Sequence, residues 1–137
     1  MRALIDTNVI LDVLFDRQEF LPASADVWIA NEQGLFEGFV SAITPVNVYC
    51  IARNSKRDKK VARQLVSTVL DAFQVCTVSL EDLRAAISSS VDDYEDAVQV
   101  VNALKAQVDV IVTRDLKDYA NSPIRALTPM EFIQELA

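Results

Sequence analysis

The segment Arg2-Ala3-Leu4-Ile5-Asp6-Thr7-Asn8-Val9-Ile10-Leu11 decides the fold of this chain. Its first four residues form a short apolar run that ends at a carboxylate, which predicts a buried strand. Apolar residues then recur at helical spacing as far as Leu14, so we expect a tight turn and a helix that Thr7 or Asn8 caps. A buried strand that leads directly into a helix is the first unit of an α/β protein.

The rest of the chain repeats this alternation of strand and helix. Strands separated by helical patterns predict a parallel sheet with helices on both faces. Because no linker divides the sequence, we predict one domain over residues 1–137, a Rossmann-like three-layer α/β/α sandwich with a central parallel sheet of about five strands. Further strands are predicted at 38–42, 74–78, 108–113 and 124–127, and helices at 21–33, 44–54, 57–72, from 79, from 92 or 93 to 107, and from 128.

Apolar spacing also predicts which side chains the helices bury. Thr44 and Thr128, each followed by proline, are expected to cap their helices, and Ser79 with Asp82 to form a capping box. Cys50 and Cys76 are interpreted as buried small side chains of a reduced protein. Inward faces are expected at Val61, Leu65, Val69 and Leu70, at Leu83, Ala86 and Ile87, and at Tyr94, Ala97, Val98, Val101 and Leu104; Phe15, Phe20, Leu21 and Trp28 are either core or an exposed interface.

Composition excludes several kinds of chemistry. The chain has 137 residues and no histidine, which excludes Ser-His-Asp and Cys-His catalytic groups and histidine-containing zinc sites. A hydrolase with this sequence must therefore use carboxylates and hard metal ions. No apolar run approaches the ~18 residues that span a bilayer. Asp6 comes too early for a secretory signal, so we expect a cytoplasmic protein without a membrane partner.

Positive charge is concentrated in one segment of an acidic chain. The net charge is −7, yet residues 53–63, RNSKRDKKVAR, carry six of the 13 basic residues against a single acid. Such a patch is a candidate to bind the phosphate backbone of RNA. Charge alone favours the simpler interpretation, a solvated helix start with ordinary surface lysines. The six candidate RNA-binding residues are Arg53, Lys56, Arg57, Lys59, Lys60 and Arg63.

Two aspartates fall at the predicted ligand-binding edge of the sheet, and a third borders the buried face of a predicted helix. Asp6 directly follows the first strand and Asp115 lies two residues after the fourth, and parallel sheets bind ligands at the carboxyl ends of their strands. One strand-end aspartate is most often a loop or capping residue, but two on adjacent strands favour function. Asp96 borders the buried face of its helix, and helix capping explains it less well than it explains the neighbouring acids.

Converging carboxylates favour a particular chemistry. They repel one another, which raises their pKa values and destabilises the fold unless they share a cation. Oxygen ligands suit Mg²⁺ or Mn²⁺, and such ions activate water and stabilise the oxygens of an in-line displacement. The sequence therefore predicts a nuclease-type site built from acids on separate elements.

Three segments resemble, in order and spacing, the motifs of PIN domains. Leu4-Ile-Asp6-Thr7-Asn8-Val-Ile-Leu resembles their opening, where a strand delivers an aspartate followed by Thr or Ser and Asn. Asp92-Asp-Tyr-Glu-Asp96-Ala resembles their D-[FY]-E-D-A helix start. Ile111-Val-Thr113-Arg114-Asp115-Leu-Lys-Asp118-Tyr119 resembles their TRNxxDF segment. The resemblance covers essentially the whole chain.

The resemblance implies a PIN-like fold and a ribonuclease that depends on Mg²⁺ or Mn²⁺ and leaves a 5′-phosphate and a 3′-hydroxyl. Asp6, Asp96 and Asp115 match the family's metal ligands and catalytic residues. Many small bacterial members are VapC-type toxins, inhibited by an antitoxin and often dimeric, so an antitoxin and a second copy are candidate partners beside RNA. The supporting residues are Thr7 and Thr113, as hydroxyl donors to the Asp6 carboxylate or to a metal-bound water, with Asn8, Asn47 and Asp93. Asp118 is an alternative ligand or a further supporting acid.

The chain departs from the family pattern at Asn47. PIN domains usually carry a glutamate there, on the helix after the second strand. An asparagine can coordinate through its carbonyl but adds no charge, so we expect weaker binding of a second metal. Asp93, one turn before Asp96, is a candidate to supply the missing charge.

Three other functions compete with the ribonuclease. Asn47 motivates a degenerate PIN domain that binds RNA or protein without cleaving it. A response-regulator receiver needs adjacent acids after the first strand, an aspartate after the third and a lysine after the fifth, and this chain has none of these. A haloacid-dehalogenase-type phosphatase needs a second aspartate at the position that Asn8 occupies.

Overall fold

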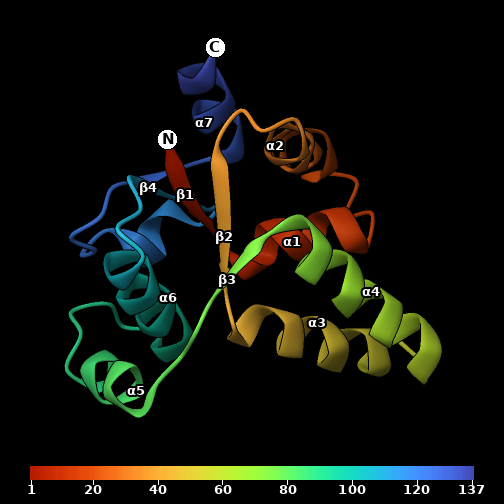
Figure 1. Ribbon diagram of the computed structural model, residues 1–137, viewed down its shortest axis with the longest axis horizontal. Helices are drawn as coiled ribbons and strands as arrows, with labels where there is room; N and C mark the ends of the chain where they lie inside the picture. Colours follow the sequence, from red (N-terminus) through yellow and green to blue (C-terminus); the bar gives the residue numbers. More distant parts are fainter.

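A computed structural model describes residues 1–137 and contains one parallel five-stranded sheet with the strand order β3-β2-β1-β4-β5 (Figure 1). Because β1 is central, Leu4 lies beside Phe39 on one side and Ile111 on the other. The prediction of a parallel sheet of about five strands is confirmed. The strands are β1 (Arg2–Ile5), β2 (Glu37–Ser41), β3 (Gln74–Cys76), β4 (Val110–Val112) and β5 (Ala126–Leu127).

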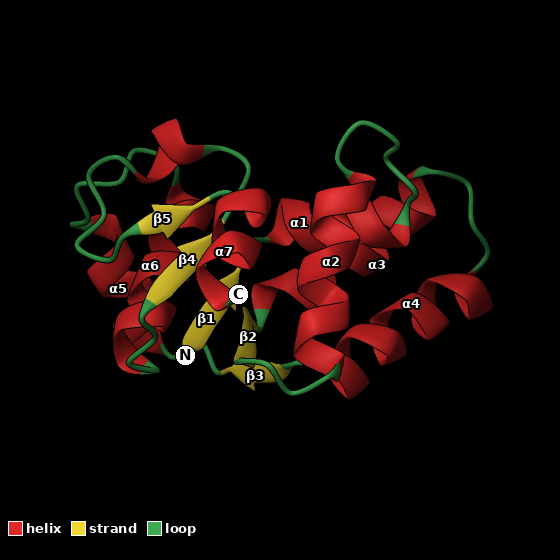
Figure 2. Ribbon diagram, turned by 90° about the horizontal axis from the view of Figure 1, so that it is seen from above, coloured by secondary structure: helices red, strands yellow, loops and turns green.

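Helices cover both faces of the sheet, which confirms the three-layer α/β/α architecture. Helices α5 and α6 lie on one face, and α1 to α4 lie on the other (Figures 1 and 2). None of the helices is both long and apolar enough to cross a membrane. The helices are α1 (Thr7–Leu14), α2 (Leu21–Glu32), α3 (Ile43–Asn54), α4 (Lys59–Ala72), α5 (Leu80–Ile87), α6 (Tyr94–Lys105) and α7 (Pro129–Leu136), with a 3₁₀ helix η1 (Leu116–Tyr119).

Two hydrophobic cores follow from the alternation of side chains along β1. Ala3 and Ile5 face the core beneath α1, α2 and α7, where Phe132 is also fully buried. Leu4 faces the opposite core beneath α6, together with Ile111. A strand buried on both faces needs an apolar residue at every position, which is why the opening run is continuous.

The helix starts agree with the sequence at some positions and differ at others. The predicted capping box at Ser79 is present, and Thr128 caps α7 as expected, in a capping box with Glu131. The expectation that Thr7 or Asn8 caps α1 is wrong, because Asp6 is the N-cap residue. Thr44 was also wrongly expected as a cap: α3 begins at Ile43, and the buried Thr44 hydroxyl lies 2.8 Å from that of Thr7.

Several helices bury narrower faces than their apolar spacing suggested. Helix α4 packs mainly against α3, and α5 mainly against α6, so only one stripe of each is covered. Cys76 is buried as expected, but Cys50 is exposed. Trp28 belongs to the core, where its ring meets Phe73 edge-on. The side chains wrongly expected to be buried are Val61, Leu70, Leu83, Ile87, Tyr94 and Leu104.

Candidate functional site

The sheet topology brings Asp6 and Asp115 to the same edge. Asp6 follows β1, and Asp115 follows β4, which pairs directly with β1. The Asp6 amide extends this pairing by donating to the Val112 carbonyl at 2.9 Å. Asp96 approaches from the first turn of α6, which packs against the sheet. All three aspartates therefore lie around the carboxyl ends of the central strands.

Asp6 lies buried at the centre of this group, and hydrogen bonds offset only part of the free-energy cost of burying its carboxylate. Its Oδ1 accepts from Gln99 Nε2 at 2.9 Å, and its Oδ2 accepts from Thr113 Oγ1 at 2.8 Å. Burial raises the pKa of Asp6 above its ordinary value, while the hydrogen bonds from Gln99 and Thr113 oppose the rise. The charge of Asp115 raises this pKa further.

Tyr119 connects Asp6 to Asp96. Its hydroxyl oxygen lies 3.1 Å from Asp96 Oδ1 and 3.3 Å from Asp6 Oδ1, and it accepts from Gln99 Nε2 at 3.0 Å. Burial, followed by repulsion from Asp6, raises the pKa of Asp96 to about 7. The two acids are thus close enough to influence each other's ionisation, although Asp6 follows β1 and Asp96 lies on α6.

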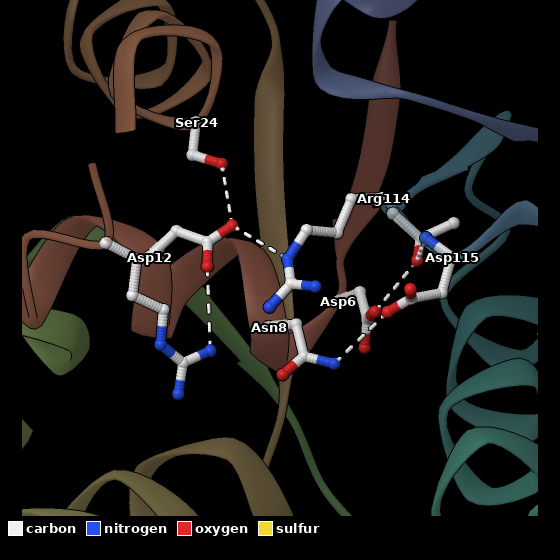
Figure 3. A network of polar contacts seen from close by, with 8 residues as sticks. Asp6, Asn8, Asp12, Ser24, Arg114 and Asp115 are labelled. Carbon is white, nitrogen blue, oxygen red and sulfur yellow. Dashed lines mark hydrogen bonds and ion pairs between the residues drawn. The ribbon is translucent and has the colours of Figure 1, made fainter. Parts of the chain in front are cut away.

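Asp115 is held by two neighbouring polar groups (Figure 3). Asn8 Nδ2 donates to its Oδ2 at 3.3 Å, and its own amide donates to Thr113 Oγ1 at 3.0 Å. Since the same Thr113 hydroxyl donates to Asp6, one side chain links the two strand-end aspartates.

The other predicted supporting residues occupy distinct positions. Asp93 caps α6 by accepting from the Asp96 amide at 3.0 Å, and its charge raises the pKa of Asp96. Asp118 acts on that pKa in the same direction from η1. The Thr7 hydroxyl contacts Thr44 rather than the Asp6 carboxylate.

A polar pocket of about 220 Å³ opens between α1, α3 and α6. Asp6 and Asp96 both line it, and Asn47 reaches it from α3. Asp115 is not among its lining residues. The lining consists of Asp6, Thr7, Asn8, Leu11, Asn47, Ile51, Glu95, Asp96 and Gln99.

Comparisons with known proteins agree with this architecture. A family model described as a PIN domain matches residues 2–117. The chain belongs to the PIN domain family. No curated protein matches the sequence.

Solved structures similar to this PIN domain share its fold at low sequence identity. A toxin-antitoxin complex from Klebsiella pneumoniae is 22% identical with a TM-score of 0.65, covering 93% of this chain and 97% of that one. VapBC2 from Rickettsia felis, bound to a DNA fragment from its promoter, is 12% identical with a TM-score of 0.70, covering 93% and 98%. VapBC-1 from nontypeable Haemophilus influenzae is 14% identical with a TM-score of 0.66, covering 95% and 99%.

Sequence reasoning missed three polar residues of the PIN site. Gln99 had a detectable signal, because it is a polar residue one turn after Asp96 on a face that the helix buries. Tyr119 lies in one of the three PIN-like motifs, but nothing in the sequence shows that its hydroxyl reaches β1 and α6. Glu95 is one of the acids near Asp96 that helix capping was expected to explain, yet it lines the pocket.

PIN domains generally use divalent metals, and the donor set of this site can be compared with the needs of such an ion. No three His, Cys, Asp or Glu side chains are arranged to hold a metal together. Mg²⁺, however, usually binds through one or two carboxylates and keeps several waters. The donors here are oxygens throughout, and the buried Gln99 Oε1 has no hydrogen-bond partner. Burial, followed by the negative charge of Asp6, raises the pKa of Asp96, and a cation would balance that charge. The residues present therefore fit Mg²⁺ or Mn²⁺.

The basic segment lies apart from the carboxylates, at the connection between α3 and α4. Five of its six basic side chains are exposed, and none lines the acidic pocket. The exception is Arg57, whose guanidinium stacks 4.4 Å above the Phe15 ring. Lys59, Lys60 and Arg63 line an open hollow of about 500 Å³ on α4. The fold thus separates the positive patch from the acidic pocket while connecting them through α3.

Proposed function

We propose that this PIN domain is a metal-dependent endoribonuclease, and that it acts as the toxin of a toxin–antitoxin pair in the cytoplasm. One observation carries the nuclease proposal: Asp6 follows β1, Asp96 lies on α6 and Asp115 lies in the turn after β4, yet two hydroxyl groups connect them. Acids that converge without a lysine or arginine partner are typical of a cation site.

The chain's own residues have separate tasks in this proposal. Asp6 and Asp96, which line the pocket, would hold Mg²⁺ or Mn²⁺ with Asn47 as an uncharged oxygen ligand, and Asp115 beside Asp6 would complete the negative charge around the ion. Such an ion, when bound, lowers the pKa of a water molecule and stabilises the charge of a phosphodiester under attack. Thr113 and Gln99 orient the Asp6 carboxylate through their hydrogen bonds to its two oxygens. The basic residues from Arg53 to Arg63 bind the RNA backbone.

The test compares wild-type protein with Asp6→Asn on single-stranded RNA and on DNA of the same sequence, with Mn²⁺, Mg²⁺ or EDTA. We expect cleavage of RNA alone, dependent on the ion and reduced at least about 100-fold by the substitution. Glu135→Gln, on the distant helix α7, is the matched control and should cleave like wild type. Equal activity of wild type and Asp6→Asn would exclude the assignment.

The toxin proposal is supported by solved structures of toxin-antitoxin complexes that share the fold. Expression of the wild-type chain should stop growth, and expression of Asp6→Asn should not. Co-expression of a small DNA-binding protein encoded beside it should restore growth. Sedimentation of the purified chain will show whether two copies associate.

A degenerate PIN domain that binds RNA or protein without cleavage is the second candidate. Asn47 at the pocket wall favours it, because this position lacks the charge of the usual glutamate. Calorimetry separates the two functions: RNA binding without any uptake of Mn²⁺ or Mg²⁺ at millimolar concentration would support the binding module.

A further inference from the structure

A buried charged network lies beside the three carboxylates. Asp12, on α1, is 0% exposed. Its Oδ2 accepts from Arg114 Nε at 3.1 Å and from Ser24 Oγ at 3.2 Å (Figure 3). Its Oδ1 lies 3.5 Å from Arg17 Nη1. Two guanidinium groups and one hydroxyl therefore share a single carboxylate that has no access to water.

Such a network needs a reason other than stability. Desolvation of a buried carboxylate is unfavourable unless the charge is paired, and apolar residues of the same volume often stabilise a fold as well or better. A buried ion pair instead fixes the orientation of the side chains that form it, because its partners keep one geometry.

Two side chains of α1 contact the turn that follows β4. Asn8 and Asp12 are four residues apart and share one face of the helix. Asn8 donates to Asp115, and Asp12 accepts from Arg114. Two consecutive residues of the turn after β4 are thus held by two successive turns of α1. Figure 3 shows Arg114 extending from that turn to α1, while Asp115 lies next to Asp6 and Asn8.

Arg114 is fixed from a second direction as well. Its guanidinium lies 4.0 Å from the centre of the Phe20 ring, at the start of α2. A planar guanidinium that is both paired and stacked has little freedom to rotate. Its backbone, and hence that of the adjacent Asp115, is correspondingly restrained.

We propose that Asp12 and Arg114 are positioning residues that hold the 113–115 turn where Asp115 faces Asp6. The inference rests on the proposed function, since Asp115 is one of the carboxylates assigned to the metal. Neither Asp12 nor Arg114 acts on the substrate; both act through Asp115. Asp12→Asn keeps the shape of the side chain without its charge, and Arg114→Lys keeps the charge without the planar fork.

Two measurements on the purified protein test this, and neither depends on cleavage. Calorimetric titration with Mn²⁺ alone should show binding roughly 10- to 100-fold weaker in Asp12→Asn, the range for residues that orient metal ligands, with a smaller loss in Arg114→Lys. Hydrogen exchange of residues 113–119 without metal should be faster in both. Arg125→Gln breaks an exposed ion pair with Glu135 and is the control, expected to match wild type in both measurements.

The outcomes for the two variants decide whether Asp12 and Arg114 position Asp115. If Asp12→Asn does not fold, Arg114→Lys carries the test, because it leaves a cation beside the buried carboxylate. A folded Arg114→Lys with wild-type Mn²⁺ affinity and unchanged exchange of residues 113–119 overturns the proposal. Failure of the proposed function looks different: wild type itself then takes up no Mn²⁺ and does not cleave RNA. In that case the exchange rates alone decide, and unchanged rates overturn the positioning role.

Discussion

Tyr119 carries one hydroxyl proton and lies within hydrogen-bonding distance of two carboxylates, those of Asp6 and Asp96. It can donate to only one of them at a time. Gln99 donates to both Asp6 and Tyr119. Burial, together with repulsion from neighbouring carboxylates, outweighs these hydrogen bonds and raises the pKa values of both acids.

The first prediction concerns pH. The pKa of Asp96 rises from 3.8 to about 7 on folding, so between these values the folded protein binds more protons than the unfolded chain. The free energy of unfolding must then fall as pH rises through this window. We expect the melting temperature of the protein in EDTA to decrease from pH 5 to pH 8, and Mn²⁺ at pH 8 to restore it.

Asp96→Asn is the control for this pH dependence, because it removes the titrating group. Its melting temperature should change less over the same range. A wild-type melting temperature that stays flat or rises between pH 5 and pH 8 would contradict the prediction.

The second prediction concerns the Tyr119 hydroxyl. Tyr119→Phe removes a hydroxyl that lies within hydrogen-bonding distance of both Asp6 and Asp96, so the free energy of unfolding in urea should fall by about 1–2 kcal/mol. The same change should raise the pKa of Asp96, since the hydrogen bond from Tyr119 lowers it. Tyr49→Phe, on α3 outside this cluster, is the matched control, and equal stability of the two variants would contradict the prediction.

At the scale of elements, Asn31 connects a strand to two helices. Asn31, near the end of α2, accepts from the Gly38 amide of β2 at 3.0 Å and donates to the Ala72 carbonyl at the end of α4 at 2.6 Å. The contact needs a residue without Cβ at position 38. A Cβ there would lie 2.4 Å from Asn31 Oδ1 and 2.9 Å from Phe73 Cδ1.

The third prediction follows from this contact. Gly38→Ala should lower the free energy of unfolding by roughly 1–3 kcal/mol, the usual cost of inserting a carbon into a packed site. In an Asn31→Ala background, Gly38→Ala should lower the free energy of unfolding by a smaller amount, because one of the two colliding side chains is absent. Chemical unfolding of the four proteins measures this difference, and strict additivity of the two substitutions would contradict it.

At the scale of the whole molecule, the fold separates opposite charges along one helix. Asn47 of α3 lines the acidic pocket, while Arg53 lies near the end of the same helix. Their separation of six positions corresponds to about 9 Å along the helix axis. Figure 2 shows α3 and α4 on the side of the molecule opposite α5. An RNA strand on the patch would therefore have a short path to the pocket despite the net charge of −7.

The fourth prediction tests this patch through salt dependence. With Asp6→Asn as a background that limits cleavage, the double substitution Lys60→Gln and Arg63→Gln should weaken binding of single-stranded RNA. The slope of the logarithm of the RNA association constant against the logarithm of the salt concentration should decrease in magnitude by about 0.7 for each phosphate that the variant no longer neutralises. Arg84→Gln, on α5, should leave the slope unchanged. A double variant with the wild-type slope would show that RNA binds elsewhere.

Much of the architecture was predictable because it depends on local periodicity. The order of strands and helices, the parallel sheet and the family membership follow from the apolar pattern and three short motifs. Burial was predicted less well: Ile87 and Tyr94 have helical apolar spacing, yet they are exposed. Spacing shows which side of a helix is apolar, but the width of the buried face depends on how many neighbours that helix has.

The amino-acid sequence by itself determined that one aspartate follows the first strand and another follows the fourth, because a buried strand is recognisable from its run of apolar neighbours. Only the tertiary structure decided that Tyr119 and Gln99 lie between Asp6 and Asp96, and that Asp12 pairs with Arg114. These partners are separated by up to 113 residues. Hydrogen bonds and ion pairs form over a few ångströms, so partners so far apart in the chain meet only after the sheet has aligned its strands and the helices have packed on it.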